Sequence, residues 1–473
     1  MKSSISELPD DLVLKILSFL STKHAVATSL LSKRWKSLWT KVPRLKYDVK
    51  DRTRSFERFL DKSLLAHQSL LLESLYFTID FTLWNKDIGP WIRTALHHHH
   101  CHLRELEIDA SLTRTLLPPE LFTCKTLVVL KLDGTAIDLV EPLTTVCLPS
   151  LETLHVDSSR LFDSGSLQML LSSCKFLTDL IIIMGSRFAA AEFNVSWCKT
   201  LVSLKLQGLK DVIISNSISS SSSGVSSLPF LKTLHVARMV NLNNDSFCRL
   251  LSNCPLLSDL TLEEKTSDLL LNLDIDMPCL QRLLIITKVK GSTHLCALLS
   301  NYIPKLAIIA PSFKYFNIHE LLHNKYTCFY VRVRLTRDPS ELEDTSIFRW
   351  ILHLELSIGS ERSGEMLVDL LQLSIKLMVL KLKNVFERNY LYLWDPPSSV
   401  PECLLSSLEV LEWRGYTGVY GDRELVSYLL NHALCLKTAK IFSEPYDVGN
   451  KQQTVKDLAA MSRGSNSCEL VLK

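Results

Sequence analysis

A run of metal-binding side chains, HHHHCH at residues 97–102, is the densest cluster of chemically active groups in the sequence. Imidazole and thiolate groups bind zinc, and a zinc site needs three or four protein ligands around one ion. Consecutive residues of a helix or a strand point in different directions, so few of these side chains can converge on one position. We therefore expect a solvated helix end here, and we predict no metal and no cofactor.

Other catalytic signatures are missing from the sequence. It has no GxxxxGK[ST] or GxGxxG phosphate loop, no HExxH motif, and no CxxC pair of the kind that marks a RING domain. Ser, His and Asp residues are plentiful, but no spacing singles out a nucleophile and its base. The sequence gives no positive support for an enzyme, although an unrecognised enzyme stays open as an alternative.

The 13 cysteines are scattered along the chain, and their odd number suits a reducing compartment better than a disulfide framework. We therefore expect a cytoplasmic and/or nuclear protein. No apolar run approaches the roughly 18 to 20 residues of a membrane span. The apolar segment at residues 5–20 follows acidic residues instead of the cationic region of a signal peptide, so we expect no membrane association.

Length and charge bound the possible architectures. The 473 residues exceed the roughly 250 to 300 at which a single core stops growing, which predicts several domains or one elongated repeat array. The net charge of +3 is too small to indicate nucleic-acid binding. The charge is unevenly distributed along the chain. Residues 1–50 contain ten Lys and Arg and four Asp and Glu, which gives this segment a net charge of +6, and the remaining residues carry a net charge of about −3.

A repeat organises the middle of the chain. The pattern L-x-x-L-x-[L/I/V] recurs with gaps of 24, 24, 26, 24, 30, 26 and 23 residues between its first leucines. Six of these seven gaps fall within the roughly 20 to 29 residues of a leucine-rich repeat. The first leucines are Leu103, Leu127, Leu151, Leu177, Leu201, Leu231, Leu257 and Leu280.

Each repeat predicts a short strand whose leucines point inward, and stacked repeats share one continuous core. Segments 163–174 and 243–254 have a polar start and helical spacing, so they are expected to be outer helices. Cysteines three residues before four of the leucines are expected to be packed core thiols. The pattern lacks the usual Asn after the last leucine, and it is irregular at residues 305–350. A serine-rich segment at 215–227 lies in the longest gap between repeats and predicts a flexible loop.

The opening segment, ISELPDDLVLKILSFL, predicts a helix with Pro9 in its first turn and Asp10 and Asp11 at the positive end of its dipole. Its apolar residues surround most of the helix, so two faces need cover. A second helical segment starts at the capping candidates Ser21 and Thr22 and can cover one of them. Either the repeats or another protein must cover the other face, because each exposed large apolar side chain forgoes roughly 1.5 to 3 kcal/mol.

Residues 5–39, ISELPDDLVLKILSFLSTKHAVATSLLSKRWKSLW, resemble an F-box, particularly the plant form. Ser21 stands where the family usually has Pro. The resemblance implies that this helical hairpin docks on a Skp-type adaptor, and through it on the cullin and RING subunits of a ubiquitin ligase. The residues it implies for adaptor contact or for the packing of the hairpin are Leu8, Pro9, Leu12, Ile16, Leu17, Leu20, Leu31, Trp35, Leu38 and Trp39.

The C-terminal part carries a second resemblance. Residues 405–441 and the segment TVKDLAAMSRGSNSCELVL that follows resemble the FBD region of plant F-box and leucine-rich-repeat proteins. We expect a helix at 424–433 between strands at 408–413 and 436–441, forming a cap on the solenoid. The predicted fold is α/β: an F-box at 1–50, an irregular leucine-rich-repeat solenoid at 70–390, and an FBD region at 391–473.

The family resemblance implies a substrate-recognition subunit of a Skp-cullin-F-box (SCF) ligase, which does no chemistry itself. A non-degradative F-box scaffold is the alternative. Neither nucleic acid nor a membrane is an expected partner, and a small-molecule co-ligand stays open. Alternate strand residues are expected to face the concave side and to bind an unknown target protein, with acidic early strands favouring a basic segment. They are Glu105, Glu107, Asp109, Lys131, Asp133, His155, Asp157, Arg282, Lys381, Lys383 and Arg414.

Overall fold

The structure, a computed structural model, describes most of the chain. The described residues are 8–49, 54–67, 72–79, 88–98, 102–110, 115–134, 137–139, 145–157, 164–184, 192–194, 198–208, 211–213, 228–237, 244–264, 273–287, 305–310, 312–320, 330–334, 351–358, 363–384, 394, 396–443 and 451–473. The chain divides into two compact units, the first comprising residues 1–231 and 239–241 and the second residues 232–238 and 242–473.

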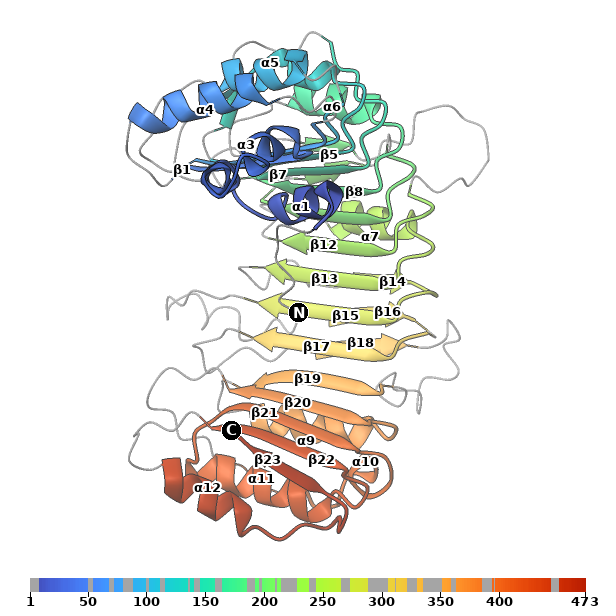
Figure 1. The fold of residues 1–473 in the computed structure, drawn as a ribbon. Coiled ribbons are helices and arrows are strands. Elements are labelled where there is room, and N and C mark those ends of the chain that lie inside the picture. Colours follow the sequence, from blue (N-terminus) through green and yellow to red (C-terminus); the bar gives the residue numbers. More distant parts are fainter. Residues whose placement is uncertain are drawn as a thin grey trace, which may run out of the picture. The chain divides into compact units, whose positions relative to one another are not determined.

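The first unit is built on a parallel sheet with one strand per repeat (Figure 1). Each strand pairs with the next in uniform register, so equivalent residues of successive repeats lie side by side. In spatial order the strands are β1 (Arg44–Val49), β2 (Ser74–Ile79), β3 (Glu105–Asp109), β5 (Val129–Asp133), β7 (Thr153–Asp157), β8 (Asp179–Ile183) and β10 (Ser203–Gln207).

Helices and short strands complete the first unit. The hairpin before the sheet contains α1 (Asp10–Leu17), α2 (Thr22–Ala27) and α3 (Trp35–Leu38), with 3₁₀ turns η2 (Thr28–Leu30) and η3 (Trp39–Lys41). Connections between sheet strands form α4 (Arg54–Ala66), α5 (Gly89–His98), the 3₁₀ turn η5 (Pro119–Thr123) and α6 (Ser164–Ser173). Two small parallel pairs join β4 (Thr115–Leu117) to β6 (Ile137–Leu139) and β9 (Glu192–Asn194) to β11 (Asp211–Ile213).

The second unit repeats the same plan. Its main sheet runs β12 (Thr233–Ala237), β13 (Asp259–Glu264), β15 (Arg282–Thr287), β17 (Tyr315–Glu320), β19 (His353–Ile358), β20 (Val379–Asn384), β21 (Val410–Tyr416), β22 (Thr438–Ser443) and β23 (Glu469–Leu472). A second sheet pairs β14 (Leu273–Asp276), β16 (Lys305–Ile309) and β18 (Tyr330–Arg334). The helices are α7 (Asn244–Ser252), α9 (Ser363–Leu373), α10 (Glu402–Ser406), α11 (Tyr420–His432) and α12 (Lys451–Ala459).

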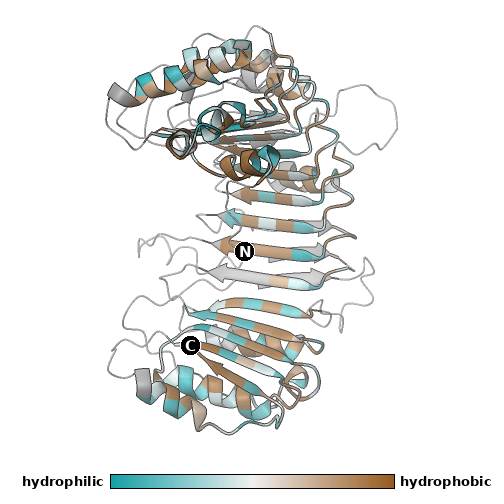
Figure 2. Ribbon diagram, viewed as in Figure 1, coloured by the Kyte–Doolittle hydropathy of each residue, from teal (hydrophilic) through white to brown (hydrophobic). Residues whose placement is uncertain are grey.

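The predicted leucine core is confirmed. All eight repeat leucines, from Leu103 to Leu280, are at most 1% exposed. The strands alternate buried and partly exposed positions, as in β3, β5, β7 and β8, and the alternation is visible as bands of apolar and polar colour along the strands (Figure 2). Burial of each leucine contributes roughly 1.5 to 3 kcal/mol, so every added repeat extends the core that stabilises its neighbours.

Backbone hydrogen bonds take the place of the asparagine ladder of more regular arrays. At the start of each strand, two consecutive N–H groups donate to one carbonyl of the preceding repeat. Val128 and Val129 donate to Arg104 at 2.8 and 2.9 Å, and Glu152 and Thr153 donate to Val128 at 2.9 and 3.0 Å. The same arrangement continues at Lys232 in the second unit. The repeats therefore stack in register without the missing side chain.

The cysteines before the repeat leucines lie in this core, as expected. Cys174, Cys198 and Cys254 are at most 4% exposed, and burial raises the pKa of each thiol to about 12. The thiols of Cys174 and Cys254 donate to the carbonyl oxygens of Leu170 and Leu250, each at 3.1 Å. These side chains stay protonated at neutral pH, so they pack instead of acting as nucleophiles.

The structure extends the sheet beyond the repeats that the sequence predicts. It begins at β1, within the range predicted for the F-box, and continues through β2, which lies inside the predicted solenoid range and has Phe77 at the last position of the leucine pattern. In the irregular range 305–350, β17 joins the main sheet while β16 and β18 join the second one. The serine-rich segment 215–227 lies outside the described residues. The predicted strand, helix and strand of the C-terminal part are confirmed as β21, α11 and β22.

Candidate protein-interaction surfaces

The N-terminal hairpin has its own core. Val13 and Leu17 of α1 pack with Ala25, Trp35, Leu38, Trp39 and Val42, all at most 9% exposed. Proline fixes the start of this structure, because Pro9 is the N-cap of α1 and Asp10 and Asp11 fill its first turn. At the second helix, Ser21 caps α2 by accepting a hydrogen bond from the His24 N–H at 3.4 Å. Serine thus replaces the family's usual proline with a side-chain cap.

The predicted second helix is interrupted. Instead of one helix through residue 39, the chain forms α2, η2, α3 and η3 in succession. Trp35, Leu38 and Trp39, at positions i, i+3 and i+4, lie on one side of this segment and pack with Val13 and Leu17 of α1. Thr22 ties the hairpin to the sheet, because its hydroxyl accepts a 2.9 Å hydrogen bond from the Lys46 N–H of β1.

A second apolar surface of the hairpin is uncovered. Leu12, Ile16 and Phe19 follow one another at helical spacing next to the buried stripe of Val13 and Leu17. Their exposed fractions are 49%, 40% and 75%, and Leu30 and Leu31 at η2 are 90% and 68% exposed. We call these five residues the exposed hairpin surface. Exposed apolar groups gathered in this way mark interaction sites in soluble proteins.

The structure thereby sorts the ten residues that the F-box resemblance implies. Leu17, Trp35, Leu38 and Trp39 are buried in the hairpin core, and Leu8 and Leu20 pack against it while partly buried. Pro9, Leu12, Ile16 and Leu31 are exposed. Sequence reasoning missed Leu30 and Phe19 as contact candidates. The spacing of Phe19 from Leu12 and Ile16 was the available signal, whereas nothing in the spacing distinguished Leu30 from Leu31.

The basic residues of the hairpin have different roles. Arg34 holds the start of α1: its guanidinium donates to the Asp10 carboxylate at 2.6 and 2.8 Å and also to the Leu8 carbonyl. Lys33 and Lys36 are exposed. The positive charge of the N-terminal segment is therefore partly structural, and Lys33 and Lys36 belong to the part that faces solvent.

The predicted target-binding residues of the first unit lie on one sheet face, in rows set by the strand register. Glu107, Lys131 and His155 form the middle row, since each is paired with the next across β3, β5 and β7. Asp109, Asp133 and Asp157 form the next row, one aspartate per strand. We call these three residues the acidic row. Neighbouring parallel strands lie about 4.8 Å apart, so the three carboxylates are close enough to repel one another.

The pKa values of Asp133 and Asp157 reflect burial first and repulsion between neighbouring carboxylates second. Burial, together with the neighbouring Asp109 carboxylate, raises the pKa of Asp133. Burial and the Asp133 carboxylate likewise raise the pKa of Asp157. Burial also lowers the pKa of the nearby His155 imidazole, which therefore offsets little of the negative charge at neutral pH. The row is a place where an added positive charge relieves an unfavourable interaction.

Other acidic residues of this face already have partners. The Tyr76 and Ser74 hydroxyls donate to the Glu105 carboxylate at 2.6 and 2.9 Å, and Arg44 lies 3.5 Å away. Burial tends to raise the pKa of Glu105, but these contacts outweigh it and lower the pKa. Glu107 pairs with Lys131 at 3.4 Å. Glu105 and Glu107 thus stabilise the sheet face itself.

The basic residues predicted on the later strands are also partly paired. In the second unit, Arg282 lies 3.2 Å from Asp259, and Arg414 lies 2.6 Å from Glu412 and over the Phe442 ring at 5.3 Å. Lys381 stands between Glu355 and Glu412 in the strand register, and Lys383 is exposed. Alternating charges across neighbouring strands make this face less basic than its lysines and arginines alone suggest.

The histidine-rich run contributes no assembled site in the described part of the chain. His97 is exposed near the C-terminus of α5 and His102 is exposed before β3, while residues 99–101 lie outside the described residues. Among the residues that the structure describes, no three His, Cys, Asp or Glu side chains are grouped to hold a metal ion. A search of the same residues finds no helix that is long and apolar enough to cross a membrane.

Family models match three parts of the chain. The F-box domain matches residues 5–47, the Leucine Rich Repeat matches residues 150–174 and 231–255, and the FBD matches residues 395–441. These matches cover the hairpin, two of the stacked repeats (β7 with α6, and β12 with α7), and β21 with most of β22. The class is therefore that of leucine-rich-repeat proteins with an N-terminal F-box.

Relatives from Arabidopsis thaliana define the family more closely. A putative F-box/FBD/LRR-repeat protein is 71% identical over 90% of this chain and 97% of its own length. Two other F-box/FBD/LRR-repeat proteins are 32% and 33% identical, each over 99% of both chains. The chain belongs to the F-box/FBD/LRR-repeat family. An F-box implies binding of a Skp-type adaptor and the repeats imply protein–protein interaction, so the family has a general role as substrate adaptors of SCF ligases.

Proposed function

We propose that this protein is a substrate-recognition subunit of an SCF ubiquitin ligase, and that it binds the Skp-type adaptor through the exposed hairpin surface. The observation that carries the proposal is the division of α1 into two apolar stripes. Val13 and Leu17 are buried in the hairpin, whereas Leu12 and Ile16 beside them are 49% and 40% exposed. A helix in a small folded hairpin needs only one apolar stripe for its own packing. The second stripe is available to a partner.

The positive charge around the hairpin supports rapid association with an acidic adaptor surface. Residues 1–50 carry a net charge of +6, and Lys33 and Lys36 are exposed. Complementary charges raise association rates more than they raise affinity. In this proposal the apolar contacts therefore account for the affinity. The lysines increase the association rate and make that rate depend on salt concentration.

The repeats hold the target in this proposal, and the protein contributes proximity instead of chemistry. A bound target stays at a high effective concentration near the ubiquitin-charged enzyme. The acidic row supports a basic segment as one part of the target, since a lysine or arginine placed there relieves the repulsion among Asp109, Asp133 and Asp157. The scattered free cysteines support a reducing cytoplasmic and/or nuclear location.

Co-purification with a Skp-type adaptor tests the adaptor-binding step. In a double variant with Leu12→Ser and Ile16→Ser, each substitution removes apolar contact area, and we expect about a tenfold loss of adaptor affinity per side chain. The control is Leu405→Ser with Leu434→Ser, because these leucines of the second unit are similarly exposed, at 44% and 50%. The control should bind as the native chain does.

Either of two results would overturn this step: a folded native chain that does not bind the adaptor, or a Leu12 and Ile16 variant that binds it fully. Degradation is a separate step. If the protein is a receptor, a target captured by the repeats should turn over more slowly in cells that lack the protein. Unchanged turnover of a captured target would instead favour a non-degradative scaffold.

A further inference from the structure

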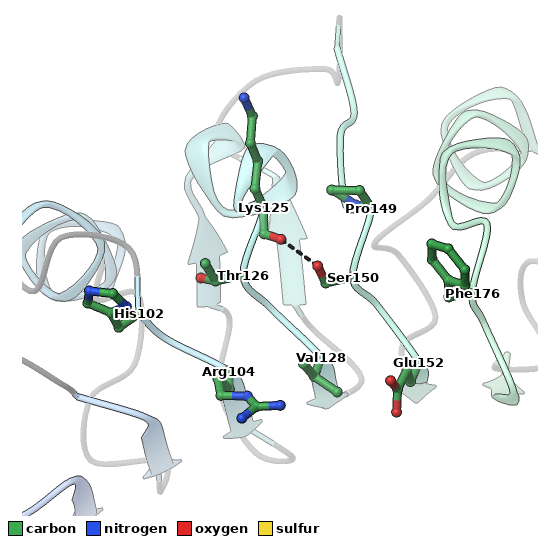
Figure 3. Close-up of a pocket in the computed structure, with 9 residues that line it drawn as sticks. All are labelled: His102, Arg104, Lys125, Thr126, Val128, Pro149, Ser150, Glu152 and Phe176. Carbon is green, nitrogen blue, oxygen red and sulfur yellow. Dashed lines mark hydrogen bonds between the residues drawn. The ribbon is translucent and has the colours of Figure 1, made fainter.

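A groove crosses the first unit just before the strands begin, at a place separate from the acidic row (Figure 3). It encloses about 490 Å³ and runs across the segments that lead into β3, β5, β7 and β8. We call it the strand-start groove. The residues that carry the argument are His102, Arg104, Lys125, Val128, Glu152 and Phe176, all of which line it.

The floor of the groove has little hydrogen-bonding capacity left. The N–H groups of Val128 and Glu152 donate to the preceding repeats at 2.8 and 2.9 Å. The Ser150 hydroxyl donates to the Lys125 carbonyl at 2.8 Å, as Figure 3 shows, and the Thr126 hydroxyl donates to the Leu103 carbonyl at 2.9 Å. A ligand therefore cannot add a strand to this backbone. Recognition has to come from the side chains.

The two sides of the groove differ in chemistry. Figure 3 shows His102 on one side and the Phe176 ring on the other, with the floor segments between them. Arg104 and Lys125 are exposed, and within the described part of the chain neither has an ion-pair partner within 4.0 Å. Phe176 is 62% exposed and Val128 is half-buried. Glu152 lies toward the Phe176 side and disfavours a second anion there.

The width of the groove sets the spacing of a ligand's groups. His102 and Phe176 lie at equivalent positions, three residues before β3 and β8, and these strands are separated by three strand-to-strand steps in the order β3-β5-β7-β8. Three steps of about 4.8 Å span about 14 Å, and four residues of an extended chain at about 3.3 Å each span about 13 Å. Side chains four residues apart in an extended chain also point to the same face.

We propose that the strand-start groove binds an extended peptide segment in which an acidic residue and a large apolar residue are four positions apart. The acidic side chain lies against Arg104 and His102, and the apolar side chain lies against the Phe176 ring. Charge complementarity with the Arg104 guanidinium fixes one end, and repulsion from Glu152 fixes the orientation. This segment differs in charge from the basic segment expected at the acidic row.

An array of nine-residue synthetic peptides tests this inference on the full-length protein held in complex with its adaptor. Each peptide carries one Glu and one Leu in an otherwise Ser/Gly sequence, with the spacing between them varied from one to six residues. Binding should be strongest at a spacing of four. In solution, Arg104→Glu and Phe176→Ser should each weaken the best fluorescein-labelled peptide about tenfold, as expected for a charge-assisted hydrogen bond and a buried aromatic contact.

Matched substitutions separate the groove from general charge and hydrophobicity. Lys175→Glu reverses a nearby exposed lysine, and Phe230→Ser removes a phenylalanine at the same repeat position that is 55% exposed and does not line the groove. Both controls should bind the peptide normally. The inference is wrong if no peptide exceeds its Lys-for-Glu counterpart, if spacing has no effect, or if the Arg104 and Phe176 variants bind as well as the controls.

The inference rests on the proposed function, since the peptide would belong to a target protein. Failure of the groove can nevertheless be distinguished from failure of the proposed function. Adaptor binding depends on the hairpin and is measured on the same samples. If the peptide does not bind but the adaptor does, the proposal for the groove is rejected and the proposed ligase role stands. An adaptor that fails to bind a folded chain rejects the ligase role and leaves the peptide measurement to be made on the free chain.

Discussion

At the scale of single residues, the acidic row holds carboxylates whose ionisation is disfavoured in the folded protein. Asp133 and Asp157 keep carboxylates in a partly buried row beside Asp109, and their pKa values are raised. A carboxyl group whose pKa is higher in the folded state than in the unfolded state binds protons preferentially on folding. The ionised pair therefore lowers stability at neutral pH, and this cost disappears at a pH low enough to protonate both states.

The double variant Asp133→Asn, Asp157→Asn should consequently be more stable than the native chain and bind its target less well. We expect its melting temperature to exceed the native value at pH 7, with the difference shrinking toward zero as the pH falls through the aspartate range. Scanning calorimetry at several pH values measures this. Glu107→Gln is the control, because it removes a charge that is paired with Lys131 and should bring no such gain.

A gain in stability that is independent of pH would contradict the electrostatic explanation. Retention of full target capture by the asparagine variant would contradict the assignment of a basic target segment to the acidic row. The two readouts are independent, so residual repulsion and target recognition can be judged separately.

At the scale of elements, the hairpin shows how one short helix carries two roles. Neighbouring residues of α1 differ completely in environment: Leu17 is 1% exposed and Ile16 is 40% exposed. Trp35 of α3 and Trp39 of η3 pack with Val13 and Leu17 in the hairpin core. Folding and binding are thus assigned to separate stripes, and substitutions can address them one at a time.

Leu17→Ala and Ile16→Ala should therefore behave differently although both delete part of an aliphatic side chain. Leu17→Ala leaves a cavity and should destabilise the hairpin by about 2 to 5 kcal/mol. Ile16→Ala changes an exposed position and should alter stability by less than about 0.5 kcal/mol while weakening adaptor binding. Hydrogen exchange of the amides in residues 12–20 measures the first effect. Equal protection in both variants would show that the hairpin does not depend on its own core.

At the scale of the whole molecule, the FBD region continues the solenoid of the second unit. β21, β22 and β23 extend the parallel sheet of the repeats before them, with one register shift between Arg414 and Tyr416 where β21 pairs with β22. α12 packs by β22, with Leu458 buried, and the Ser465 hydroxyl donates to the Leu436 carbonyl at 2.7 Å. The sheet then ends on β23, a four-residue strand that begins with Glu469 and is followed by Lys473. A short, charged edge strand is a recognised protection against edge-to-edge aggregation.

Deletion of residues 444–473 should expose the edge of β22 and part of the core beneath α12. We expect a lower melting temperature and concentration-dependent association, seen by light scattering after size exclusion. Adaptor binding by the soluble fraction should persist, since the hairpin belongs to the first unit. Lys473→Ala is the control because its backbone N–H still donates to Ile441. A deletion variant that is monomeric and melts like the native chain would show that β23 is dispensable.

The repeat spacing, the inward leucines and the order hairpin, solenoid and FBD region were determined by the sequence alone. These features follow from local periodicity, which a single sequence displays in full. The FBD strands and α11 were predictable for the same reason. β1 and β2 escaped prediction because their residues occupy the same register with Tyr and Phe in place of leucine, and only the neighbouring strands define that register.

Only the tertiary structure decided which apolar residues of the hairpin are buried and which polar residues of the strands are paired. One helix cannot show which of Ile16 and Leu17 is buried, since both side chains are strongly apolar. The position of Trp35 and Trp39 determines which one is covered. Likewise, Glu105 is held by hydroxyl groups of the preceding strand, 29 and 31 residues away. Burial and pairing are properties of neighbours distant in the chain, and packing alone brings those neighbours together.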